Sequence, residues 1–189
     1  MKITHNTVKE NISKEYIKEL KQSGNGELAN LVRENYSNSG TIIFILENLG
    51  YLPRTFNYQW IVDLLDYPSE DVRFWAVKNI GKLTSEDFIE LLSQISIHDE
   101  STMVRREAVS SIGRMRNKKV IPFMKVMLND SDPKIVCQAI RSLLVFKGEN
   151  DIDSTLKTLV NHENEMIRTV IYKEYFAQRR NDKSILPPA

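Results

Sequence analysis

The chain has 189 residues, with 26 basic and 25 acidic side chains and a formal net charge of +1. This length is enough for one domain with a sizeable core. The near-zero net charge excludes a molecule-wide attraction to nucleic acid, so any such attraction has to be local. Cys137 is the only cysteine, which excludes an internal disulfide and a multi-cysteine metal site. We expect a half-buried structural thiol there, because no adjacent basic cluster lowers its pKa.

The first residues carry no targeting signal. They lack the apolar core of a signal peptide, and no apolar run approaches the roughly 20 residues that span a bilayer. We therefore expect a cytoplasmic chain without a membrane partner. Residues 1–37 are interpreted as an N-terminal helical cap, with amphipathic helices at 11–21 and 27–36. Between them, Gly24-Asn25-Gly26 is interpreted as a plain turn, because a phosphate loop needs a preceding strand and a following lysine.

A short polar residue recurs five times at intervals of 31, 32, 31 and 32 residues. A fixed period in this range is typical of solenoids. Side-chain oxygens of these residues can accept a hydrogen bond from a free amide in the first turn of a helix. We predict a helix N-cap at each of the five: Asn38, Ser69, Ser101, Asp132 and Asn164.

Apolar residues follow each cap at intervals of four, which places them on one face of a helix. The clearest copy is Val104, Ala108 and Ile112, where the small central residue lets a neighbouring helix approach closely. Three glycines directly follow the last apolar residue and suit the left-handed turn that ends a helix. They are Gly50, Gly81 and Gly113.

A second amphipathic run follows each of the first four helices, so each unit is predicted to be a helical hairpin. These runs are 56–65, 88–97, 120–128 and 152–160. Stacked hairpins bury a continuous core, and the predicted fold class is an all-α, right-handed solenoid. We predict repeats at 38–68, 69–100, 101–131, 132–163 and 164–180, the last one partial, and a C-terminal tail or linker at 181–189.

The pattern Val-Arg-x-x-Ala-x-x-x-Ile-Gly occurs at 72–81 and again at 104–113. It resembles the HEAT-repeat family, particularly its short bacterial form. Ile167-Arg168 keeps half of the pattern, whereas Ile42 and Val136 replace the arginine in the first and fourth copies. The resemblance covers roughly residues 38–180. It implies a stacked-hairpin fold that serves mainly as a binding surface and only occasionally as an enzyme. We therefore expect a non-catalytic binding module whose second helices line a concave surface and whose partner is another protein or DNA.

The strongest local charge feature is the stretch 105–119, with six basic residues and one acid, Glu107. One interpretation is a site for DNA phosphates, since each neutralised phosphate releases a counterion. The other is that Arg105 belongs to the repeat and pairs with turn residues such as Asp99, Glu100 or Asp130. The first interpretation predicts a DNA-backbone contact formed by Arg105, Arg106, Arg114, Arg116, Lys118, Lys119, Arg179 and Arg180.

Residues 173–180, followed by Ile185-Leu186-Pro187-Pro188, resemble a junction in some bacterial restriction-modification DNA methyltransferases. In that family the junction joins an N-terminal helical-repeat region to the catalytic domain. The resemblance implies that this chain is part of a longer protein and contacts DNA or protein while the missing portion transfers the methyl group. Because the chain has neither an Asp/Asn-Pro-Pro-Tyr/Phe motif nor a glycine-rich cofactor loop, we expect no catalytic residue and no cofactor here.

Two further functions fit the sequence. A protein-assembly scaffold would use the basic stretch for an acidic partner. A helical-repeat DNA glycosylase would use a tryptophan with charged neighbours, namely Trp60 with Asp63 or Trp75 with Asp71 and Arg73. We expect the two tryptophans to pack between repeats instead. His98 is interpreted as a solvated turn residue.

Overall fold

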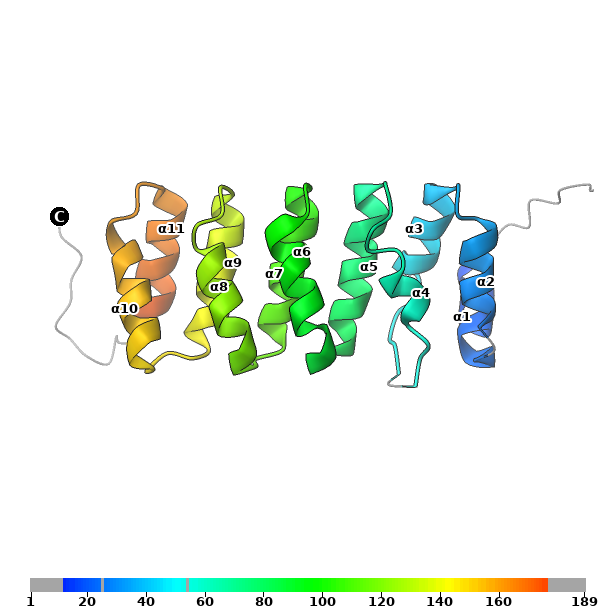
Figure 1. Cartoon of the computed structure of the whole chain (residues 1–189), viewed down its shortest axis with the longest axis horizontal. Coiled ribbons are helices and arrows are strands. Elements are labelled where there is room, and N and C mark those ends of the chain that lie inside the picture. Colours follow the sequence, from blue (N-terminus) through cyan, green and yellow to red (C-terminus); the bar gives the residue numbers. More distant parts are fainter. Residues whose placement is uncertain (1–11, 25, 54, 177–189) are drawn as a thin grey trace, which may run out of the picture. The chain divides into compact units, whose positions relative to one another are not determined.

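The computed structural model describes residues 12–24, 26–53 and 55–176, and these residues form helices joined by turns, without a strand among them. The all-α class is therefore confirmed. The chain divides into two compact units, Met1–Asn79 and Ile80–Ala189. Helix α5 (Glu70–Leu83) contributes residues to both units (Figure 1).

The first unit contains four helices before α5. They are α1 (Lys14–Ser23), α2 (Glu27–Glu34), α3 (Ser39–Glu47) and α4 (Gln59–Val62). The predicted second helix at 56–65 is wrong in extent, because only the four residues of α4 are α-helical. One local feature accompanies its late start: the Asn57 side chain accepts a hydrogen bond from the Gln59 N–H at 3.3 Å, a local alternative to a helical bond.

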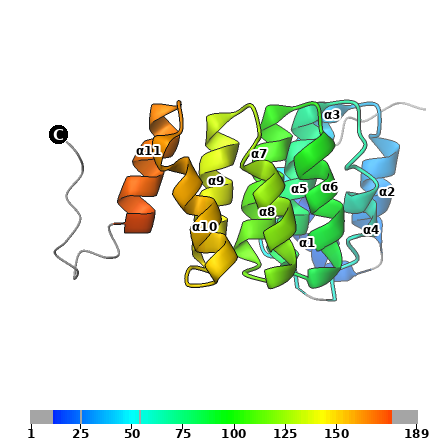
Figure 2. The same ribbon diagram turned by 60° about the vertical axis from the view of Figure 1, so that its left-hand side comes forward.

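The second unit continues the hairpin pattern. Its elements are η1 (Glu86–Phe88), α6 (Ile89–His98), α7 (Thr102–Arg114), η2 (Lys118–Val120), α8 (Ile121–Met127), α9 (Pro133–Leu144), α10 (Asn150–Thr158), η3 (Leu159–Asn161), α11 (Glu165–Val170) and the π-helix η4 (Ile171–Phe176). The first helices of successive hairpins, α7, α9 and α11, pack against one another. The second helices, α6, α8 and α10, form a parallel row beside them (Figure 2).

Three of the five predicted N-caps are confirmed, because their side chains accept a hydrogen bond from an amide in the first turn of the helix. Asn38, Asp132 and Asn164 accept from the amides of Thr41, Lys134 and Met166 at 2.8–3.1 Å. Ser101 differs from these three, since its side chain makes no capping bond. Its own N–H instead donates to the Asp99 carboxylate at 2.8 Å, so the turn before α7 is closed by the preceding aspartate. The predicted cap at Ser69 stays a prediction.

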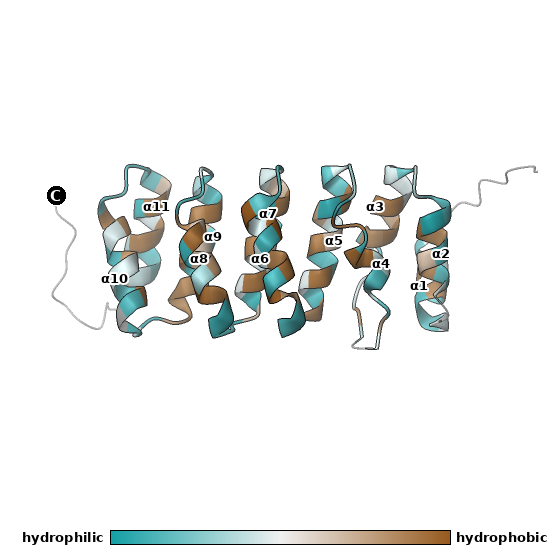
Figure 3. Ribbon diagram, in the orientation of Figure 1, coloured by the Kyte–Doolittle hydropathy of each residue, from teal (hydrophilic) through white to brown (hydrophobic). Residues whose placement is uncertain are grey.

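The predicted apolar register forms the core. In α7, Val104, Ala108 and Ile112 are fully buried, and both apolar and polar residues occur on each helix of this row (Figure 3). The same register in the last hairpin buries Tyr175 completely. In the partial repeat predicted at 164–180, the chain is α-helical from Glu165 to Val170 and then widens into η4. Residues 177–180 lie outside the described part of the chain.

Two of the three predicted turn glycines have a different role. Gly50 is left-handed with φ +62°, as predicted, but Gly81 and Gly113 lie inside α5 and α7. A Cβ on Gly81 would come within 2.2 Å of the Ser111 hydroxyl, and one on Gly113 within 2.1 Å of the Ser142 hydroxyl. These glycines therefore allow the following first helix to approach closely. The left-handed residues after α5 and α7 are Thr84 and Arg116.

Candidate functional site

The basic stretch 105–119 begins in α7 and ends in η2, and most of its charge faces a carboxylate. Ion pairs join Arg105 to Asp130, Arg106 to Asp132, Arg114 to Glu107, Lys118 to Glu149 and Lys119 to Glu86. Among the described residues, Arg116 makes no such ion pair and is exposed. Arg179 and Arg180 lie outside the described residues. The local excess of positive charge seen in the sequence is thus largely neutralised by acids distant in sequence.

Arg105 holds the turn that precedes its own helix. Its Nη1 donates to the carbonyl oxygens of Asp99 and Glu100 at 3.0 and 3.3 Å, while Nε donates to Asp130 at 3.2 Å. The side chain is largely buried. A planar guanidinium can satisfy several acceptors at once, which an ammonium group cannot do in the same geometry. Arg105 therefore bonds three segments of the second unit together.

The equivalent arginines make the same contact. Arg73 donates to the carbonyls of Tyr67 and Pro68 at 3.0 and 3.1 Å. Arg168 donates to those of His162 and Glu163 at 2.6 and 2.7 Å. The arginine of the Val-Arg pattern is thus a structural residue that binds the carbonyl end of the preceding turn, where the helix dipole favours a cation.

Arg106 connects α7 to the start of α9. Its Nη2 donates to Asp132 at 2.6 Å, and the other Asp132 oxygen accepts from the Lys134 N–H at 2.8 Å. Burial by itself raises the pKa of Asp132, but hydrogen bonds from Arg106 and from the Lys134 amide outweigh it and lower that pKa below its ordinary value. The cap of α9 is thereby an anion held by the previous hairpin.

Lysines at the start of α8 reach the neighbouring second helices on both sides. Lys119 lies 3.0 Å from Glu86 before α6, and Lys118 lies 2.7 Å from Glu149 before α10. These lysine side chains are 70% and 74% exposed. Exposed pairs contribute little to stability. A third pair, Lys125 with Asp151 at 2.6 Å, lowers the pKa of Asp151 through its hydrogen bond.

The outward side of the second helices, which we expected to line a binding surface, carries a mixed set of residues that the sequence did not identify. We call it the second-helix surface. Its exposed residues are Glu90 and Gln94 on α6, Pro122 and Val126 on α8, and Ser154 and Thr158 on α10. Val126 is 49% exposed, which makes it one of the most exposed large apolar residues described. The sequence signal for this exposed residue was its place in the helix, because Val126 lies between Met124 and Met127, which are both buried.

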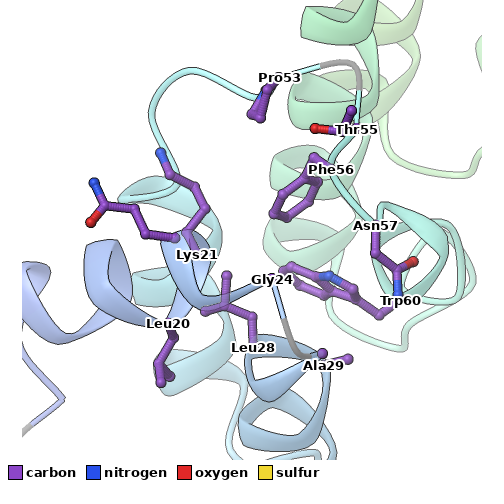
Figure 4. Close-up of a pocket in the computed structure, with 12 residues that line it drawn as sticks. Leu20, Lys21, Gly24, Leu28, Ala29, Pro53, Thr55, Phe56, Asn57 and Trp60 are labelled. Carbon is purple, nitrogen blue, oxygen red and sulfur yellow. The ribbon is translucent and has the colours of Figure 1, made fainter.

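A separate cleft of about 320 Å³ lies in the first unit, between the α1–α2 turn and the segment that precedes α4. Phe56 and Trp60 point into it with Leu28 (Figure 4). The two rings meet edge to face with centroids 6.2 Å apart. Lys21 also lines the cleft, but its ammonium group donates to the carbonyls of Leu49 and Tyr51 at 2.7 and 3.0 Å.

The residues proposed for glycosylase chemistry have other contacts. Asp63 accepts a hydrogen bond from Gln59 at 3.2 Å and does not line the cleft with Trp60. Trp75 stacks under the Lys78 ammonium, 4.4 Å from the ring centroid. Arg73 is buried and holds the two carbonyls described above. Asp71 is exposed and lies four residues before Trp75 on α5.

Cys137 and the turn histidines have structural surroundings. Cys137 is buried in α9, and burial raises the pKa of its thiol. His98 is exposed at the end of α6, as expected for a solvated turn residue. His162 accepts a hydrogen bond from the Asn164 N–H at 3.0 Å. Within the described ranges, no three His, Cys, Asp or Glu residues gather in a way that could hold a metal ion.

Comparison with known proteins agrees with this geometry. Residues 89–174 match the family model described as HEAT repeats. The chain is a helical-repeat protein. A designed armadillo repeat protein in complex with a (KR)4 peptide resembles it with a TM-score of 0.50 and 19% identity, covering 87% of this chain and 92% of that one. An engineered protein solved by the Northeast Structural Genomics Consortium resembles it with a TM-score of 0.52 and 15% identity, covering 84% and 81%.

These likenesses confirm the solenoid class of stacked helical hairpins for this helical-repeat protein. No curated protein matches the chain significantly. Among the described residues, none of the helices is both long enough and apolar enough to cross a membrane.

Proposed function

We propose that this helical-repeat protein is a non-catalytic scaffold that binds a segment of another protein along the second-helix surface. The observation that carries the proposal is that most basic residues of the stretch 105–119 form ion pairs with carboxylates of this chain. Arg105, Arg106 and Lys119 are engaged by acids of neighbouring hairpins, so the second-helix surface presents uncharged residues and Glu90 around an apolar centre at Val126. A designed armadillo repeat protein of similar fold holds a peptide, which adds a precedent for this use of stacked hairpins.

A peptide selection tests the proposal. Peptides that bind the intact protein are selected from a random library, and their affinities are then measured for two variants. Val126→Asp places a charge at the centre of the second-helix surface and is expected to weaken binding at least tenfold, the cost of about 1.4 kcal/mol at a buried contact. Val145→Asp is the matched control, because Val145 is 48% exposed but follows α9 rather than lying on α8. Equal binding by both variants contradicts the proposal.

DNA is the second candidate partner, in an accessory region of a DNA-modifying methyltransferase system. The supporting observation is the exposure of Lys118 and Lys119, since pairs as exposed as theirs are weak enough to exchange a carboxylate for a phosphate. The link to methyltransferases rests on the sequence resemblance of residues 173–188. A glycosylase activity is the least supported function, because Arg73 and Asp63 are engaged elsewhere.

A further inference from the structure

One position of the repeat is buried in the first four hairpins and exposed in the fifth. Leu46, Val77, Val109 and Ile140 recur at intervals of 31, 32 and 31 residues, and all four are fully buried. The next member of the series, 32 residues later, is Tyr172, which is 36% exposed. The fifth hairpin thus presents an apolar face where the earlier hairpins have a covered one.

The position four residues after each member of this series changes along the chain from glycine to an aromatic residue. Four residues after each member of the series stand Gly50, Gly81 and Gly113, then Leu144 and finally Phe176. Gly113 lets α9 approach until Ser142 lies against the glycine backbone. Leu144 already occupies this position on α9, and α11 packs against that helix, so stacking on this side of a first helix does not require the glycine.

Tyr172 and Phe176 form one aromatic patch, with ring centroids 5.8 Å apart. Aromatic residues are enriched in the buried centres of protein interfaces. The carboxylate of Glu174, which lies between the two aromatic residues in the sequence, forms an ion pair with Arg141 of the preceding hairpin at 2.9 Å. We call the exposed surface of Thr169, Tyr172 and Phe176 the C-terminal face.

We propose that the C-terminal face binds the same face of a second copy of this chain. The face continues the interface by which successive first helices stack, and that interface consists of helix side against helix side. Contact between two identical faces is self-complementary, needs no glycine and closes after two copies. The aromatic pair supplies the apolar area that a symmetric contact buries.

Analytical ultracentrifugation of the full chain over a concentration series tests the proposal. The unsubstituted chain is expected to dimerise, and Tyr172→Glu to weaken self-association at least about tenfold, as loss of an aromatic anchor does. Tyr172→Phe keeps the ring and is expected to retain the dimer.

Met166→Glu is the matched control on the preceding helix, α11. Met166 is 46% exposed and lies outside the C-terminal face. It is expected to leave self-association unchanged, and circular dichroism melting checks that each variant is folded. Three outcomes overturn the proposal: a monomer at every concentration, a Tyr172→Glu dimer of unchanged affinity, or an equal loss with Met166→Glu. A monomer whose η4 amides exchange slowly with deuterium would show that another part of the chain covers the face.

Discussion

Individual charged residues in this protein act mainly as connectors between segments. The sequence identified Arg105 both as a candidate DNA contact and as a repeat residue, and the structure shows it bonded to two carbonyls and to Asp130. Sequence could supply the residue and its register. It also offered the partners, because Asp99, Glu100 and Asp130 were the turn residues named for Arg105. It could not show that Asp99 and Glu100 accept through their carbonyl oxygens, whereas Asp130, 25 residues away, accepts through its carboxylate.

Replacement of Arg105 by lysine tests this role while preserving the charge. Arg105→Lys is expected to lower the free energy of unfolding by about 1–3 kcal/mol, because an ammonium group leaves at least one largely buried carbonyl or carboxylate acceptor unsatisfied. Urea denaturation measures the change. Lys119→Gln, which removes an exposed pair, is expected to cost less than about 1 kcal/mol. Equal losses for the two variants would show that Arg105 is no more structural than a surface lysine.

Asp132 gives the capping ion pair a predictable pH dependence. Its pKa is lowered in the folded chain, so its stabilising contribution is complete above the unfolded pKa of about 3.9 and disappears as pH falls through the lower folded value. We expect Asp132→Asn to lower the free energy of unfolding by about 1 kcal/mol at pH 7, because Arg106 loses its anion. The difference from the unsubstituted chain should vanish in strong acid. A difference that is constant down to pH 2 would contradict the linkage.

At the scale of the helices, register determines which side chains meet. The caps, the four-residue apolar spacing and the hairpin order were predictable from sequence, because each depends on local chemistry. The role of Gly81 and Gly113 was not, because a glycine near a helix end fits both a left-handed turn and a close helix contact. The decisive fact is the position of Ser111 and Ser142 in the next helix. The shortness of α4 likewise depends on an Asn57 side-chain bond that competes with the helix.

Glycine substitutions separate the two roles. Gly81→Ala is expected to destabilise the protein by about 1–3 kcal/mol through overpacking, because both Oγ and Cβ of Ser111 would lie within 2.6 Å of the new methyl group. Gly40→Ala in α3 is the control, since its Cβ would meet only Asn38 Oδ1 at 3.5 Å. It is expected to be neutral or to stabilise by up to about 1 kcal/mol. Thermal melting of both variants measures the effect, and a neutral Gly81→Ala would refute the close contact.

At the scale of the whole molecule, repeat chemistry was easier to predict than partner chemistry. The period predicted the class of fold because every hairpin needs the same cap and the same buried side. A net charge of +1 could not show where the local charge is neutralised. Sequence also pointed to the second helices as the binding surface, but it could not identify the residues exposed there, such as Gln94, Val126 and Thr158, because exposure depends on how the helices pack.

The most direct test of this account is duplex DNA binding, followed by fluorescence anisotropy across a salt series. Two triple variants are compared with the unsubstituted chain: Arg116→Gln with Lys118→Gln and Lys119→Gln, and a control with Lys14→Gln, Lys18→Gln and Lys157→Gln. If the basic stretch serves to join hairpins, binding is weak and both variants change it equally. A steep loss of affinity with salt that only the first variant flattens would show that the stretch binds phosphates, and it would contradict the assignment of this protein as a protein-binding scaffold with a structural basic cluster.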